Sequence, residues 1–104
     1  MEWDTWAYQD RLLRQIDERR RYRGEHITRI ARKQSNGSPF MRDQLSGEIA
    51  AMEALLGGGR FHTRDDLIKE IEHLVEKTPR CPSDTQHKDV FIGGWKHELE
   101  GRLP

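Results

Sequence analysis

Apolar residues along this chain recur at intervals of three, four and seven positions, and no segment alternates apolar and polar residues with a period of two. Such spacing places apolar side chains on one side of an α-helix, whereas a half-buried strand needs the alternation. Only 34% of the 104 residues are hydrophobic and 35% are charged, so the core of such a protein is thin. The sequence therefore predicts one small all-α domain, with a partner or self-association helping to order part of it.

The longest helix is expected at the start of the chain, within residues 1–34 and from about Asp4 to Lys33. Its apolar residues follow a seven-residue repeat with three-residue offsets, the a/d spacing of a helix-packing seam, and they are Trp6, Leu13, Ile16, Ile27 and Ile30. A helix of about 30 residues spans about 45 Å, roughly twice the length of the helices expected after it. We therefore predict a homodimer through this first helix.

Two tryptophans, Trp3 and Trp6, lie at the extreme N-terminus. Aromatic residues in such a place either fold back onto the core or anchor a partner from an exposed position. We favour the core or self-association, because Trp6 belongs to the expected seam.

Loop and capping residues divide the remainder into a helical pair over 39–77 and a tail over 78–104. Ser38 and Pro39 form an N-cap followed by proline at the first helical position. The glycine run 57–59 ends the second helix, and Thr63 is placed to cap the third. The expected apolar faces comprise Met41, Leu45, Ile49, Met52 and Leu56, then Leu67, Ile68, Ile71, Leu74 and Val75, and finally Val90, Phe91, Trp95 and Leu99 in a short fourth helix.

The densest charge lies in the stretch RRRYRGEHITRIARK, residues 19–33, which has seven basic residues and one acidic residue although the whole chain has no net charge. Such a helix can follow a phosphate backbone, and RNA fits better than duplex DNA because no base-reading motif such as a helix-turn-helix is present. The alternatives are a solvated face that pairs with the acidic helices that follow, and an acidic protein partner. The candidate nucleic-acid-binding residues are Arg19, Arg20, Arg21, Tyr22, Arg23, Arg29, Arg32 and Lys33.

Patterns for catalysis and metal binding are not found in the sequence. Cys81, His87 and His97 are spaced C-x5-H-x9-H, unlike the closely spaced ligand pairs of common zinc sites. No oxyanion-hole or phosphate-binding motif accompanies the cysteine. We therefore predict a protein that is not an enzyme and uses no cofactor or metal. A single cysteine and the lack of an apolar run of about 20 residues further predict a cytoplasmic protein with no membrane partner.

Two adjacent glycines, Gly93 and Gly94, directly precede Trp95 within the expected fourth helix. Each costs a helix interior about 1 kcal/mol relative to alanine, which favours a position where another element approaches the backbone closely. Phe91 and Trp95 are four residues apart and share one face of that helix. We predict that the glycines admit a neighbouring helix, most directly the third.

The segment 80–102 resembles the ribosome modulation factor family. In that family a Cys-Pro pair and a short polar linker precede an aromatic residue and a Gly-Gly-Trp element that opens a second helix, and the matching residues here are Cys81, Pro82, Phe91, Gly93, Gly94 and Trp95. The resemblance implies a two-helix unit with the tryptophan in its joint, contact with ribosomal RNA, and translational silencing. The chain departs from the family in its acidic preceding helix and in Ser83, where an aromatic residue is expected.

The resulting functional hypothesis is a non-enzymatic, RNA-contacting regulator, with a ribosome-associated translational modulator as its most specific form. The alternative is a protein-binding inhibitor of the kind found in phages and plasmids, which docks a host protein complex. The basic stretch separates the two, because salt-sensitive binding through free arginines favours RNA, whereas exposed tryptophans beside it favour a protein.

Overall fold

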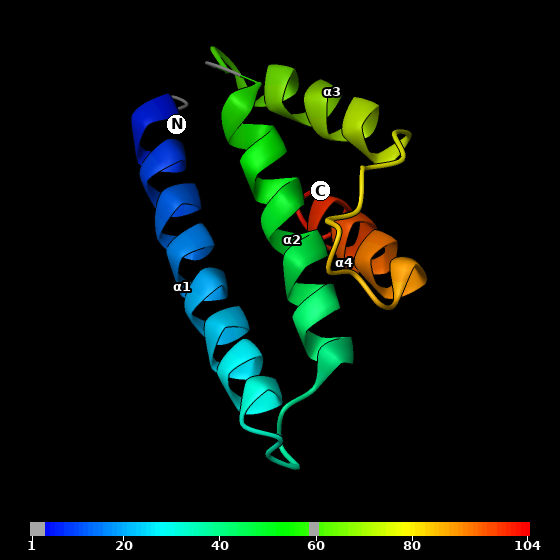
Figure 1. Cartoon of the computed structure of the whole chain (residues 1–104). Coiled ribbons are helices and arrows are strands. Elements are labelled where there is room, and N and C mark those ends of the chain that lie inside the picture. The colour runs from blue at the N-terminus through cyan, green and yellow to red at the C-terminus, as the bar shows by residue number, and fades with distance from the viewer. Residues whose placement is uncertain (1–3, 59–60) are drawn as a thin grey trace.

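The computed structural model describes residues 4–58 and 61–104, and this part of the chain contains four helices and no strand. The helices are α1 (Thr5–Ala31), α2 (Pro39–Gly57), α3 (Arg64–Val75) and α4 (Lys88–Glu100). The helices α1 and α2 form a long antiparallel hairpin, α4 packs on another side of α2, and α3 lies across the C-terminal end of α2 (Figure 1). The predicted all-α fold with a long first helix is confirmed, whereas Trp3 lies outside the described residues.

The predicted helix starts are set by local hydrogen bonds. The Ser38 hydroxyl accepts from the Met41 N–H at 3.1 Å, and Pro39 is the first residue of α2. The Thr63 hydroxyl accepts from the Asp66 N–H, also at 3.1 Å. These side chains satisfy backbone donors that have no partner within their own helix. The starts of α2 and α3 therefore depend on residues only three positions apart, which explains why the sequence predicted them.

The core forms around α2, which is buried on several sides. Every residue from Leu45 to Ile49 is buried, because α1 and α4 pack against different sides of this helix. Helix α3 closes one end of the core through Leu67, Ile71 and Leu74. The cluster of buried apolar side chains comprises Leu12, Ile16, Ala51, Met52, Leu55, Phe61, Leu67, Ile71, Leu74, Trp95 and Leu99.

The five residues of the predicted seam along α1 divide between two sides of the helix, and three of them are exposed in the single chain. Leu12 and Ile16 are the buried residues of this helix, whereas Leu13 is 46% exposed, Ile27 43% and Trp6 65%. Leu12 and Leu13 are neighbours, so an apolar repeat can be drawn through either of them. Packing against α2 selects Leu12, which lies one turn from Ile16 on the same face. A second correction concerns Met41 of α2, which was expected on a buried face and is 37% exposed.

The N-terminus of α4 is capped by a residue of α2. One carboxylate oxygen of Asp43 accepts hydrogen bonds from the backbone N–H groups of Gln86 at 3.0 Å and His87 at 2.8 Å. The other oxygen accepts from Arg42 Nε at 3.0 Å, and the same guanidinium donates to the Asp84 carbonyl at 3.1 Å. His87, at the N-cap position itself, makes no capping hydrogen bond with its own side chain. Asp43 therefore fixes the start of α4 against α2.

The pKa of Asp43 reflects this environment. Burial by itself raises the pKa, but hydrogen bonds donated by the His87 N–H, Arg42 and the Gln86 N–H outweigh it and hold the pKa below the usual value of 3.8. A carboxyl group whose pKa is lowered by folding stabilises the fold at pH values above its unfolded pKa. That contribution is lost as the pH falls through the lower, folded pKa.

Asp43→Asn is expected to lower the free energy of unfolding by about 2 kcal/mol at pH 7, because it weakens charge-assisted hydrogen bonds in a buried place. The difference in the free energy of unfolding between parent and variant should shrink as the pH falls below about 4, because the Asp43 carboxyl of the parent then becomes protonated. Urea unfolding at several pH values between 7 and 2 measures this, with the exposed Asp10→Asn as the control. A difference that stays constant with pH would contradict the assigned role.

Candidate nucleic-acid interface

The basic stretch of residues 19–33 occupies the C-terminal half of α1 and the two residues after it, and its side chains point in more than one direction. One group of arginines faces the other helices and forms ion pairs with them. A second group lines an open surface on the outer side of α1. The two groups have different roles, because ion pairs with other helices hold the charges of Arg19 and Arg20 in the first group.

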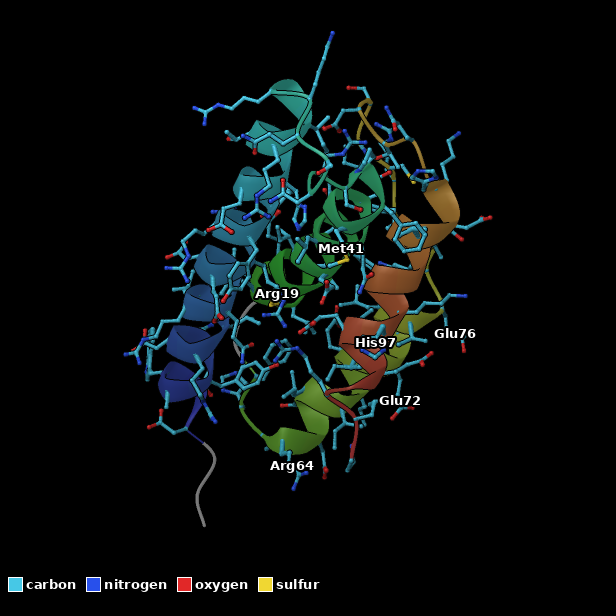
Figure 2. All side chains as sticks on the ribbon, turned by 90° about the horizontal axis from the view of Figure 1, so that it is seen from below. Arg19, Met41, Arg64, Glu72, Glu76 and His97 are labelled. Carbon is cyan, nitrogen blue, oxygen red and sulfur yellow. The ribbon has the colours of Figure 1, made fainter. Side chains whose placement is uncertain are left out.

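Arg19 and Arg20 belong to the first group. The Arg19 guanidinium lies 3.5 Å from Glu48 of α2 and 3.8 Å from Glu98 of α4, and its side chain is 29% exposed. Figure 2 shows Arg19 pointing from α1 into the space between the helices, on the side of α4. Arg20 Nη2 lies 2.6 Å from a carboxylate oxygen of Glu53. The alternative in which basic residues pair with the following helices is therefore correct for these two positions.

A polar cluster continues from Arg19 toward the C-terminus of the chain. Arg102 pairs with Glu98 at 2.8 Å and donates hydrogen bonds to Gln15 and to the hydroxyl of Tyr8, both of α1. Burial raises the pKa of Glu48, although the charge of Arg19 opposes the rise. These contacts hold the C-terminal end of α4 against α1, so the arginines in them serve the fold.

The inner side of α1 also holds Arg23. Its Nε atom is buried and has no hydrogen-bond partner within residues 4–58 and 61–104. The candidate set of eight residues therefore divides, and Arg19, Arg20 and Arg23 are directed away from the outer surface that a nucleic acid would meet.

The open surface comprises Arg21, Gly24, Glu25, Thr28, Arg29, Arg32 and Gln34. Within the described residues an ion pair on this surface joins Arg29 to Glu25 at 3.9 Å, with both side chains at least one third exposed. Lys33 follows directly and is exposed, with a φ of 55° where the chain leaves the helix. We call Arg21, Arg29, Arg32 and Lys33 the outer basic surface.

Tyr22 lies beside the outer basic surface. Its ring is 39% exposed, the Arg21 guanidinium lies 5.4 Å from the ring centroid, and its hydroxyl donates to Glu18 at 3.2 Å. A cation over an aromatic face forms a favourable contact that holds both side chains in place. The arrangement presents positive charge and an accessible aromatic ring on one side of α1, which suits contact with phosphates and an unpaired base.

The glycine pair in α4 admits α2, so the expectation that it admits α3 is wrong. A Cβ atom on Gly94 would lie 2.3 Å from the Gln44 carbonyl oxygen, and one on Gly47 would lie 2.0 Å from the Phe91 carbonyl oxygen. Both neighbours are backbone atoms, so the two helices approach each other as closely as their backbones allow. Gly93 is different, because a Cβ atom there would meet nothing within 4 Å and the residue is exposed.

Trp95 accounts for the contact between α4 and α3. Its side chain is 5% exposed, and its indole N–H donates to the Leu74 carbonyl at 3.1 Å, in the last turn of α3. Phe91 is 1% exposed, Cys81 is half-buried with a free thiol, and Pro82 is exposed. Three of the six residues that carry the family resemblance, Phe91, Gly94 and Trp95, are thus buried, where they position α4.

Side chains that bind metal ions do not converge in the described part of the chain. No group of three or more His, Cys, Asp or Glu residues there could hold a metal ion. None of the helices in that part is long and apolar enough to cross a membrane.

Comparison with known proteins does not assign a family. No family model matches the chain, and neither the curated proteins nor the solved structures contain a match. The geometry of the described residues is therefore the basis for the functional proposal.

Sequence reasoning missed several residues that shape this region. Asp43 and Gly47 of α2, and Glu98 of α4, have no local pattern around them that marks their roles. For each of them a decisive neighbour lies more than 40 residues away along the chain: Asp43 accepts from the His87 N–H, Gly47 lies against the Phe91 carbonyl, and Glu98 pairs with Arg19 as well as with the nearby Arg102. Only an excess of acidic residues after position 34, twelve against nine basic ones, indicated partners for the arginines of α1.

Proposed function

We propose that this protein is a non-enzymatic RNA-binding protein that contacts RNA through the outer basic surface of α1. The observation that carries the proposal is that Arg21, Arg29 and Arg32 line one open surface of the helix beside Glu25, and that the exposed Lys33 directly follows Arg32. Four cations in such a position attract a phosphate backbone by releasing its counterions. The accessible ring of Tyr22 adds a stacking platform for an unpaired base.

Single-stranded or irregular RNA is the ligand class that fits this surface best. The surface is shallow and charged, so its contacts fall mainly on phosphates and carry little sequence information. An exposed aromatic ring is useful where bases are unstacked, as in loops and bulges, and less useful against a regular duplex. We therefore expect binding that depends strongly on salt and weakly on sequence.

A ribosome-associated role is the more specific form of the proposal. It is supported by the resemblance of segment 80–102 to the ribosome modulation factor family. Because Phe91, Gly94 and Trp95 are buried, they would act by positioning α4, and the RNA contact would come from α1. Co-sedimentation with bacterial ribosomes, before and after nuclease treatment, tests this more specific role separately from RNA binding itself.

Replacing Arg21, Arg29 and Arg32 with glutamine is expected to weaken binding to a single-stranded RNA and to flatten its salt dependence. The slope of log affinity against log salt should fall by about 2, because each lost phosphate contact removes about 0.7 from the slope for single strands. Filter-binding titrations at several salt concentrations measure both quantities. The variant spares Arg19 and Arg20, whose ion pairs with other helices make their replacement a test of stability.

The matched control replaces Arg64, Lys69 and Lys77 with glutamine. These residues are exposed in or just after α3, so the control removes the same charge away from the outer basic surface. Glu72 and Glu76 lie on the outer side of the same helix and make its surroundings acidic (Figure 2). An equal loss of affinity in both triple variants, or an unchanged salt slope in the first, would overturn the proposal in favour of a protein partner.

A further inference from the structure

Helix α1 has a second exposed side, distinct from the outer basic surface. Leu13 is 46% exposed and Ile27 43%, and Trp6, which is 65% exposed, lies on the same line along the helix. Residues seven apart stay on one side of an α-helix and drift by only about 20° per heptad. Trp6, Leu13, Arg20 and Ile27 therefore form one stripe, which we call the apolar stripe, although the half-exposed Arg20 side chain reaches from it to Glu53 of α2.

Gly24 adds an independent observation. It lies four residues after Arg20, between the apolar stripe and the open surface that it also lines, and a Cβ atom placed on it would meet no atom within 4 Å. Glycine inside a helix is unfavourable relative to alanine unless something approaches its backbone. No contact among the described residues supplies that approach at Gly24.

The charges along α1 are arranged in two opposite halves. Residues 4–18 carry four acidic and two basic side chains, whereas residues 19–33 carry one acidic and seven basic, of which Arg21, Arg29, Arg32 and Lys33 remain outside the contacts with other helices. Two such helices laid side by side in parallel would place basic half against basic half. Laid antiparallel, each acidic half lies against a basic half, which is the favourable arrangement.

We infer that two copies of this chain associate through the apolar stripe, with their α1 helices antiparallel. The stripe is nearly symmetric about a point between residues 16 and 17, because Trp6 and Ile27 lie equally far from that point, as do Leu13 and Arg20. In this register Ile27 of each copy lies near Trp6 of the other. Leu13 lies near Arg20 and Gly24 of the other copy, where the missing side chain of Gly24 leaves room for it.

The proposed pairing makes the earlier expectation of a homodimer through the first helix specific. The seam predicted from the sequence mixed the two sides of α1, because Ile16 faces α2 whereas Leu13 and Ile27 do not. The outer basic surface lies on a further side of the helix, so RNA binding and pairing do not compete for the same residues. Each can fail without the other.

Cysteine cross-linking tests the orientation. In the antiparallel register, position 17 lies next to the two-fold axis and close to its own equivalent. Position 27 lies about ten residues from the axis, so its two copies are separated by about 30 Å at 1.5 Å per residue. In a Cys81→Ser background, oxidation should convert Asp17→Cys into a covalent dimer and leave Ile27→Cys monomeric. Cross-linking of Ile27→Cys to itself would show a parallel dimer, and failure of Asp17→Cys to cross-link would overturn the inference.

Sedimentation equilibrium on nuclease-treated protein tests the surface itself without RNA. The parent protein is expected to be dimeric at tens of micromolar, and Leu13→Glu with Ile27→Glu to be monomeric at the same concentration. Both positions are exposed, so circular dichroism should show unchanged helix content. The control is Phe40→Glu, a replacement at a 52% exposed apolar residue of α2, which should leave the dimer intact. A monomeric parent, or a double variant that stays dimeric, would overturn the inference.

Discussion

Gly47→Ala is expected to lower the free energy of unfolding by about 3 kcal/mol, at the upper end of what overpacking costs. The added Cβ atom would lie 2.0 Å from the Phe91 carbonyl oxygen, and a backbone atom cannot move aside as a side chain can. Alanine is intrinsically better than glycine in a helix by about 1 kcal/mol. The expected net loss therefore requires a steric conflict that costs more than this gain. Denaturant unfolding followed by circular dichroism measures the free energy of unfolding. We expect α4 to pack less closely against α2 in the variant.

The adjacent glycines of α4 provide a matched comparison for this prediction. Gly94→Ala should destabilise in the same way, because its Cβ atom would lie 2.3 Å from the Gln44 carbonyl oxygen. Gly93→Ala should instead leave stability unchanged or raise it by up to about 1 kcal/mol, because its position is open. If the Gly93 and Gly94 variants behaved alike, the close crossing of α2 and α4 would be wrong.

Trp95→Ala is expected to cost about 3–5 kcal/mol, a large share of the stability of a domain of this size. The ring is 5% exposed and belongs to the apolar cluster shared by α1, α2, α3 and α4. Its removal leaves a cavity between helices and also removes one hydrogen bond to the Leu74 carbonyl, which still accepts from the Lys77 N–H. Thermal melting followed by circular dichroism is the measurement.

Trp95→Phe separates the two contributions of this side chain. Phenylalanine keeps most of the buried apolar area but cannot donate to the Leu74 carbonyl. The expected loss is about 1–2 kcal/mol, which combines the lost hydrogen bond with the smaller ring. A nearly neutral Trp95→Ala would show that α3 and α4 do not meet through this residue.

The two proposals for α1 give this helix three functional sides. Its inner side carries Leu12, Ile16 and the arginines that bind acidic residues of α2 and α4. The outer basic surface is proposed to contact RNA, and the apolar stripe is proposed to contact a second copy. A dimer built in this way would present two outer basic surfaces, so RNA affinity measured above and below the dimerisation concentration should differ.

The sequence by itself determined the helical class and most helix boundaries. Ser38, Pro39 and Thr63 act on backbone groups within three residues, so their effects do not depend on the rest of the fold. The spacing of Leu67, Ile71 and Leu74 likewise determined which side of α3 is buried, because that helix has only one apolar face. The concentration of arginines in α1 marked the candidate interface before its geometry was known.

Only the tertiary structure decided which of those features face inward. Leu12 and Leu13 are equivalent in an apolar repeat, and packing against α2 distinguishes them. A count of charges does not distinguish Arg19 from Arg21. In the structure Arg19 pairs with Glu48 and Glu98 of the other helices, whereas Arg21 lines an open surface. The glycine pair signalled a close approach, but the identity of α2 as the neighbour depended on Gly47, almost 50 residues away in the chain. Contacts between residues that far apart leave no local spacing in the sequence, because they arise from the arrangement of whole helices.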